Sequence, residues 1–462
     1  MKNLTYWSII AIGLLFSCKN AKQEATGTDT YAVSASSEAC LADPAWFMTD
    51  PATGKRKTSA PEEGKSSVFG NNATVSNCDF HQWSWQKFLW LTNDISGKPL
   101  FLDRFIQVNP QTVPVAGSAD KVILATADQN QATGNVLKTN STYNANDSSY
   151  TVYYSIHVDS SLYNSIQKFA PMNPDDYKDS TFAVGSLELK IAWVNKEALR
   201  DTSNYFITSG SIEGADVRIA LLGMHVVGVV YNHPEFVWAT FEHQDMVPYY
   251  DWAATTTSDV PVTSGTNYLF FDSTATGTLA NIELSSDSTN VFAVNRYGVP
   301  RKAGNGFLVT SQSEPENYNN IDSINASVHS QLTDVWNNYF YNGSIWVNTE
   351  GYDYPTQQAQ LLDSLGNTLG YAAQDTLLRG SIAAYNITME TYEQLGFSPT
   401  SIHGQSVSNL GNCFQCHSAS RGSALNVSHI FNGAVDNTKG LTRFETKQKH
   451  LDEITTFIKQ MK

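Results

Sequence analysis

The clearest structural signal in this chain is the segment Leu187-Glu188-Leu189-Lys190-Ile191-Ala192-Trp193-Val194. Large apolar side chains occupy every second position, and Glu188 and Lys190 lie between them. Successive side chains of a β-strand point to opposite faces, so this alternation predicts a strand with two unlike faces.

Other segments around it repeat the strand pattern. They are Tyr150 to His157, Arg218 to Tyr231 and Glu235 to His243. Arg218 to Tyr231 is a long apolar run that Gly223 and Gly228 interrupt. In Glu235 to His243, Trp238 and Glu242 share one face. Clusters of Gly, Asn, Asp and Ser separate these runs, so we expect an antiparallel sheet or sandwich.

The strongest chemical signal is Cys413-Phe414-Gln415-Cys416-His417, a C-x-x-C-H motif. Two thiols at this spacing lie on one edge of a helical turn and can add to the two vinyl groups of a porphyrin. The following histidine then presents its imidazole to the iron as the proximal ligand. The motif therefore predicts one covalently bound haem c on Cys413, Cys416 and His417.

The same cysteines allow two other interpretations. A zinc site would combine Cys413 and Cys416 with one or two of His403, His417 and His429, but no second cysteine pair follows at zinc-finger spacing. A redox-active dithiol would need a βαβ context, and residues 406–412 do not resemble a strand. Haem attachment is the interpretation that requires both thiols and the adjacent imidazole in this order.

The ligand on the other side of the iron decides the chemistry. Met389 is the first candidate and His429 the second, while Met461, His403 or an open position remain as alternatives. A methionine raises the reduction potential and is typical of an electron carrier, whereas a second histidine lowers it. An open position would allow peroxide, oxygen or small-ligand chemistry.

The N-terminus has the features of a bacterial export signal. Met1-Lys2-Asn3 precedes an apolar run, Leu4 to Phe16, which is too short to span a bilayer and ends just before Cys18. Leucine three residues before this cysteine and serine just before it resemble a lipoprotein box, which predicts cleavage and a lipid on Cys18. In enteric bacteria, aspartate directly after this cysteine keeps a lipoprotein at the inner membrane, but here Lys19 follows. We therefore expect an outer-membrane lipoprotein on the periplasmic or the cell-surface side. Plain secretion is the alternative.

Cys40 and Cys78 are the two remaining cysteines. In an oxidising compartment they are expected to pair, with two unpaired buried thiols as the alternative. The bridge would stabilise the fold by about 4 kcal/mol in the chain-entropy model.

The fold class predicted from these signals is α+β. A signal peptide (1–17) and a tether (18–45) precede a β-rich domain of antiparallel sheet or sandwich type (46–320), with a Trp-rich helix near 79–91. An α-helical, cytochrome c-like haem domain (321–462) follows. Its helices are expected at Ser323 to Tyr339, Thr356 to Leu365, Thr388 to Leu395 and Thr442 to Lys462, where apolar residues recur at helical spacing.

Composition limits the partners. The net charge of −15 argues against nucleic acid and against electrostatic docking on anionic lipid, and it favours a basic redox partner. Any contact with a membrane is expected through the lipid anchor alone. The sequence contains no nucleophile elbow, phosphate loop or zincin helix, so a hydrolase or a kinase has no support.

Several segments together resemble a poorly characterised family of long bacterial single-haem cytochrome c-like proteins. They are the Trp-rich helix, Leu187 to Trp193, Gly223-Met224-His225, Phe236 to His243, Thr388 to Thr391, the C-x-x-C-H motif and Ser428 to Phe431. The likeness covers most of residues 75–435 and implies covalent haem but no substrate. A Thr/Ser-rich insert from Thr255 to Thr289 departs from the family pattern.

The resemblance also draws attention to His225, Glu242 and His243. A histidine and a glutamate on neighbouring strands would suit an acid/base pair or a metal site, or else a hydrogen-bonded sheet interior.

The function expected from the sequence is electron transfer by a lipid-anchored monohaem c-type cytochrome. One alternative is a haem enzyme of peroxidase or oxygenase type with an open or displaceable sixth position. Another is a surface binding module with an accessory haem.

Overall fold

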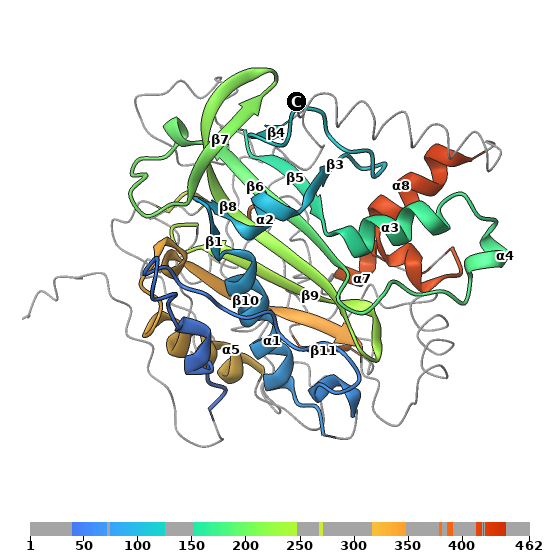
Figure 1. Ribbon diagram of the computed structural model, residues 1–462, viewed down its shortest axis with the longest axis horizontal. Helices are drawn as coiled ribbons and strands as arrows, with labels where there is room; N and C mark the ends of the chain where they lie inside the picture. Colours follow the sequence, from blue (N-terminus) through green and yellow to red (C-terminus); the bar gives the residue numbers. More distant parts are fainter. Residues whose placement is uncertain are drawn as a thin grey trace, which may run out of the picture. The chain divides into compact units, whose positions relative to one another are not determined.

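A nine-stranded sheet forms the framework of the described residues (Figure 1). The computed structural model describes residues 39–71, 74–124, 151–246, 268–270, 317–347, 378–380, 386–390, 413–417, 419 and 421–439. The strands are β3 (Ile106–Val108), β4 (Val122–Leu124), β5 (Tyr153–Val158), β6 (Leu187–Asn195), β7 (Ile207–Ile212), β8 (Ala215–Val230), β9 (His233–His243), β10 (Tyr339–Val347) and β11 (Leu378–Gly380). Their order is β11-β10-β9-β8-β6-β5-β3, with β7 paired to β8 and to β4. A separate ribbon joins β1 (Asp94–Ile95) to β2 (Lys98–Pro99).

The strand predictions are confirmed. β5, β6, β8 and β9 lie where the sequence pattern places them, and each of these neighbouring pairs is antiparallel. Only β4 and β7 pair in parallel among the described strands. The register aligns Lys190 with His225 and His225 with Thr240, so these side chains form one row across β6, β8 and β9.

Helices cover both faces of this sheet. They are α1 (Asn77–Leu91), α2 (Leu100–Arg104), α3 (Ser160–Phe169), α4 (Pro174–Tyr177), α5 (Asn317–His329), α7 (Cys413–Cys416) and α8 (His429–Thr438). Short 3-10 turns are η1 (Pro44–Phe47), η2 (Val68–Gly70), η4 (Lys196–Ala198), η6 (Val335–Asn338) and η7 (Ala424–Val427). In Figure 1, α1 and α5 lie near β9 and β10 at the lower left of the view. The helices α3, α7 and α8 lie together on its right side.

The Trp-rich helix covers one face. α1 begins after Ser76, whose side chain and that of Asp79 form a capping box. Trp85 packs edge-on against Phe241 of β9 at a centroid distance of 5.1 Å, and Phe88 stacks on the same ring at 4.2 Å. The aromatic side chains of α1 are therefore core residues.

Two glycines of β8 allow other segments of the chain to pack closely against this strand, one on each face of the sheet. A Cβ atom on Gly228 would lie 2.8 Å from Trp83 of α1, and a Cβ atom on Gly223 would lie 2.6 Å from the hydroxyl of Thr388. A glycine inside a strand often marks such an approach. On the face of Gly223, an apolar core joins α3, α8 and the C-x-x-C-H segment to the sheet.

The predicted fold class, a β-rich domain followed by an α-helical haem domain, is wrong. β10 and β11 lie after residue 320, yet they extend the same antiparallel sheet within one compact unit, Val33–Lys462. The described residues contain no separate α-helical cytochrome c domain. β10 is fully buried and rich in aromatic and β-branched residues, a composition that favours a strand. The helix expected at Ser323 to Tyr339 ends at His329, and the motif helix α7 has one turn.

Several predictions fall outside the described residues. These are the signal peptide, the lipid anchor at Cys18, most of the tether, and the helices at Thr356 to Leu365 and Thr442 to Lys462. Among the helices that the structure does describe, none has the length and apolar character needed to cross a membrane.

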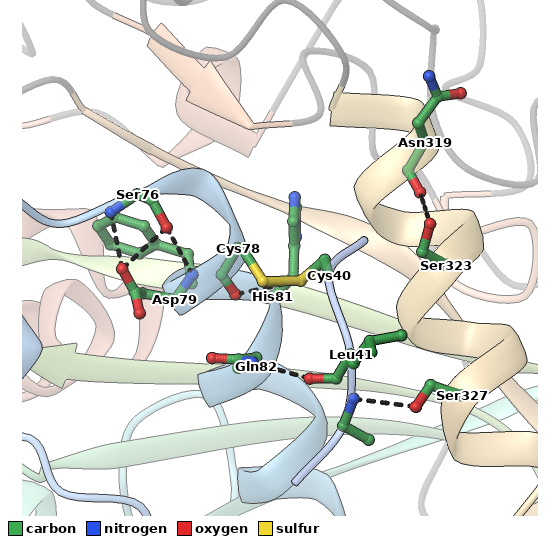
Figure 2. The surroundings of a disulfide bond; sticks show 12 residues. Cys40, Leu41, Ser76, Cys78, Asp79, His81, Gln82, Asn319, Ser323 and Ser327 are labelled. Atoms are coloured by element: carbon green, nitrogen blue, oxygen red, sulfur yellow. Dashed lines mark hydrogen bonds between the residues drawn. A yellow bond between two sulfur atoms is a disulfide. The ribbon is translucent and has the colours of Figure 1, made fainter. Parts of the chain in front are cut away.

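A disulfide joins the N-terminal segment to α1. Cys40 and Cys78 form this bond, and Figure 2 shows the segment between α1 and α5. The amide of Ala42 donates to the hydroxyl of Ser327 at 3.0 Å, and Gln82 donates to the carbonyl of Leu41 at 2.7 Å. The segment thus bridges two helices on one face of the sheet.

We predict that replacing both cysteines with serine, Cys40→Ser with Cys78→Ser, lowers the free energy of unfolding by about 4 kcal/mol. The disulfide closes a sequence separation of 38 residues, which restricts the unfolded chain. Urea denaturation followed by tryptophan fluorescence measures the loss. Wild-type protein under a reductant is the control and should match the double variant; unchanged midpoints for both would contradict a stabilising disulfide.

Candidate functional site

The C-x-x-C-H motif lies on the sheet face that α1 does not cover. Its first four residues form the single turn of α7, so the two cysteines are one helical turn apart and are not joined in a disulfide. Cys413 is partly buried and Cys416 is exposed. Between them, Phe414 is buried in the core and its ring lies 6.1 Å from that of Trp238 on β9. Phe414 thus anchors the turn on the sheet.

The imidazole of His417 is held in one tautomer. Nδ1 lies 2.8 Å from the carbonyl oxygen of Val427, which can only accept, so Nδ1 carries the proton. Burial, followed by the nearby His429, lowers the pKa of His417, which keeps the ring neutral. The lone pair is then on Nε2. A backbone carbonyl that fixes a histidine in this way is the usual support of a metal-binding imidazole.

Two aromatic rings restrict the rotation of this imidazole. The Trp238 ring lies 4.3 Å away at a tilt of 48°, and the His429 ring stacks on it at 3.8 Å and 16°. Trp238 is itself fixed, because its indole N–H donates to the carbonyl of Glu235 at 2.8 Å. His429 Nε2 donates to the carbonyl of Cys416 at 3.0 Å.

The stacked rings are not arranged as two axial ligands of one iron. Such ligands meet the metal end-on from opposite faces of the porphyrin, whereas His417 and His429 lie face to face. His429 could serve as the sixth ligand only if this pair separated. Its side chain is exposed, at the rim of the site.

Met389 lies in a buried turn on the same face of the sheet. It belongs to the apolar core that also includes Phe414 and Cys413. Residues 386–390 form a turn, where a helix was expected to begin at Thr388; the rest of that predicted helix, residues 391–395, lies outside the described residues. Asn386 donates to Thr240 and to the carbonyl of Phe241, each at 2.9 Å, which docks the turn on β9.

Charged side chains of the sheet lie beneath both segments. Glu188 and Lys190 of β6 and His225 of β8 share this face. His225 Nε2 lies 2.9 Å from Glu390, whose other oxygen accepts the amide of Asn386. Glu188 accepts a hydrogen bond from Ser428 at 2.8 Å. Burial raises the pKa of Glu188 to about 7, and it also raises the pKa of Cys413. Burial acts to raise the pKa of Glu390 as well, but His225 and the hydrogen bonds that Glu390 accepts outweigh it, so the pKa of Glu390 is lowered.

Of the two interpretations given for His225, Glu242 and His243, the described contacts fit hydrogen bonding within the structure and not a pair formed among these three residues. His225 pairs with Glu390, and Glu242 accepts the amide of Ile387 at 2.5 Å. His243 lies on the other face of β9, where it stacks on Tyr205 at 3.7 Å. Glu242 thus supports the turn that carries Met389.

No cluster of three or more His, Cys, Asp or Glu side chains is arranged to hold a metal ion within the described ranges. The zinc reading therefore has no geometric support there. His403 and Met461, the other ligands considered, lie outside these ranges.

The chain matches no family model, no curated protein and no solved structure. The resemblance to long single-haem cytochromes stays a prediction.

Sequence reasoning did not assign a role to Glu390, Lys190 or Val427. The alternation of Glu188 and Lys190 with apolar residues did indicate a polar strand face. Nothing in the pattern showed that residues more than 150 positions later cover this face, since the contact depends on chain topology.

We predict that Glu188→Gln changes how stability depends on pH. Because the folded pKa of Glu188 is about 7 and its ordinary value is 4.5, the folded protein holds this proton more tightly than the unfolded chain. Wild-type stability should fall by up to about 3 kcal/mol as pH rises from about 4.5 to about 7. The variant should lack this component. Urea titrations at several pH values test this, with exposed Glu197→Gln as the control; parallel curves for all three proteins would contradict it.

We predict that Gly223→Ala lowers the free energy of unfolding by about 1–3 kcal/mol, because the added methyl group would meet Thr388 and Asn386 at 2.6–2.9 Å. Gly64→Ala is the matched control, since nothing lies within 4 Å of its Cβ position. Thermal denaturation compares the two. Equal stability of both variants would show that the turn does not press on β8.

Proposed function

We propose that this protein is a monohaem c-type cytochrome that transfers electrons, with one haem attached to Cys413 and Cys416 and its iron bound by His417. The observation that carries the proposal is the 2.8 Å hydrogen bond from His417 Nδ1 to Val427, directly after two cysteines on one helical turn. This bond leaves Nε2 as the ligand atom, as a proximal histidine requires.

The residues around the motif fit such a group. Both thiols lie on α7, one partly buried and one exposed, so an attached macrocycle would reach from the surface into the core. Apolar Phe414 and Met389 and the Trp238 indole supply walls on one side. When bound, haem c supplies a one-electron couple.

The protein's own residues hold that group in place and keep water away. Val427 increases the electron density on the His417 ring through the Nδ1 hydrogen bond. Trp238 and His429 limit its rotation. The buried turn at 386–390 offers Met389 as the sixth ligand, and a sulfur ligand that excludes others suits an electron carrier. The exposed Cys416 edge is where an electron would enter or leave.

Export, cleavage before Cys18 and lipid anchoring at the outer membrane belong to the same proposal. The supporting features are the short basic and apolar N-terminal segments and the cysteine that follows them. The acidic net charge of −15 favours a basic redox partner.

A haem enzyme is the second candidate, and the His225–Glu390 pair favours it. A histidine oriented by a carboxylate at 2.9 Å is an arrangement used for proton transfer. This function would require an open or displaceable sixth position near the pair. Added cyanide or carbon monoxide separates the two: a carrier with a sulfur ligand keeps its spectrum at neutral pH, and an enzyme of this type does not.

We predict that the matured protein stays coloured after denaturation in acidified acetone, because the porphyrin is held by two thioether bonds. The double variant Cys413→Ala with Cys416→Ala should lose all of this colour. The Cys40→Ser, Cys78→Ser variant is the matched control and should keep it. A colourless wild-type protein, matured in a host with a haem-attachment system, would refute the proposal.

We predict that Met389→Ala abolishes the weak sulfur-to-iron charge-transfer band of the oxidised protein and lowers the reduction potential. Met172→Ala, a partly buried methionine packed against the same core, is the control and should leave the band intact. If the band is absent from the wild type, or survives in Met389→Ala, Met389 is not the ligand.

A further inference from the structure

The sheet face below the C-x-x-C-H segment contains one lysine with unusual surroundings. Lys190 of β6 is partly buried, and its Nζ atom lies 4.6 Å from the centre of the Tyr154 ring. Among the described residues, this ammonium group makes no hydrogen bond and no ion pair. Lysine has three N–H donors and no acceptor, so this group can still donate to a ligand.

The two nearest carboxylates are held by other donors. Glu188 accepts from Ser428, and the oxygens of Glu390 accept from His225 and from the amide of Asn386. Lys190 influences the pKa values of both carboxylates, so it is close to them without bonding to either. The cation is therefore kept beside the site while its own donors remain available.

The location of Lys190 relates it to the iron site. Its row, Lys190–His225–Thr240, is next to the row Glu188–Val227–Trp238, and His417 packs against Trp238. Tyr154, which supports the ammonium, donates its hydroxyl to the carbonyl of Met389 at 3.2 Å. Lys190 thus lies on the sheet between the segment with the proximal histidine and the turn with the candidate sixth ligand.

We infer that Lys190 binds a carboxylate of the covalently attached haem; this rests on the function proposed above. Haem has two propionate groups, on the pyrrole rings that do not bear the vinyl groups. With the thioether edge fixed at Cys413 and Cys416, the propionate edge is directed away from α7. A carboxylate that reaches the sheet needs a charged donor, and an ammonium on a half-buried strand face supplies one.

The test is a comparison of three variants of the full-length, haem-loaded protein. Lys190→Gln removes the charge, Lys190→Arg keeps it with a different donor geometry, and Lys168→Gln is the matched control. Lys168 is exposed on α3 and also lies over an aromatic ring, Phe169, at 4.5 Å. It therefore has the same kind of ring contact without the proposed carboxylate.

The first measurement is the propionate bending band in the resonance Raman spectrum, which responds to hydrogen bonding of that group. The band should shift in Lys190→Gln and in Lys190→Arg and remain in place in Lys168→Gln. The second is the reduction potential. Loss of the cation in Lys190→Gln should favour the oxidised form about tenfold, or about 59 mV for one electron. Lys190→Arg should stay near the wild type.

The outcomes separate this inference from the proposed function. If the wild type holds covalent haem but the band and the potential are unchanged in Lys190→Gln, the lysine does not bind the propionate and the cytochrome proposal stands. If Lys190→Gln is not recovered as folded protein, an unshifted band in Lys190→Arg overturns the inference. If the wild type holds no haem, the proposed function itself fails.

Discussion

The hydrogen bond from His417 to the carbonyl of Val427 joins the attachment motif to the rest of the protein. It determines which ring nitrogen is available, while burial lowers the pKa of His417 and keeps the imidazole neutral. Val427 is the last residue of η7, and the next residue, Ser428, caps α8 and donates to Glu188 on β6. The orientation of the His417 imidazole therefore depends on a contact between the C-terminal segment and a central strand.

The two faces of the sheet have different surroundings. One face packs against the aromatic side chains of α1, and the disulfide from Cys40 to Cys78 ties the N-terminal segment to that helix. The other face presents Glu188, Lys190, His225 and Glu242 to two segments that come from far along the chain. Each of these charged groups except Lys190 has a hydrogen-bond partner there, so they fix the position of the turn at 386–390 and of the η7–α8 junction. A small helical cytochrome has no need of such a platform.

The sequence allowed good prediction wherever the signal was local. The alternation in Leu187 to Val194 and the spacing in α1 follow directly from strand and helix geometry, and both elements form where expected. The C-terminal half was misjudged, because the helix expected at Ser323 to Tyr339 ends at His329, and the 3-10 turn η6 and the strand β10 follow it. Pairing of β10 with β9 is a long-range contact, and periodicity within one segment cannot show it. The partner of His225 was missed for the same reason: Glu390 is distant in sequence and Glu242 is near.

The most direct test of the central claim is mass spectrometry of a proteolytic peptide that spans Cys413 to His417, taken from the matured, unfolded protein. The account predicts that this peptide carries the added mass of one haem, bound through both cysteines, and that no other peptide does. A peptide of unmodified mass, with both thiols open to alkylation, would contradict it.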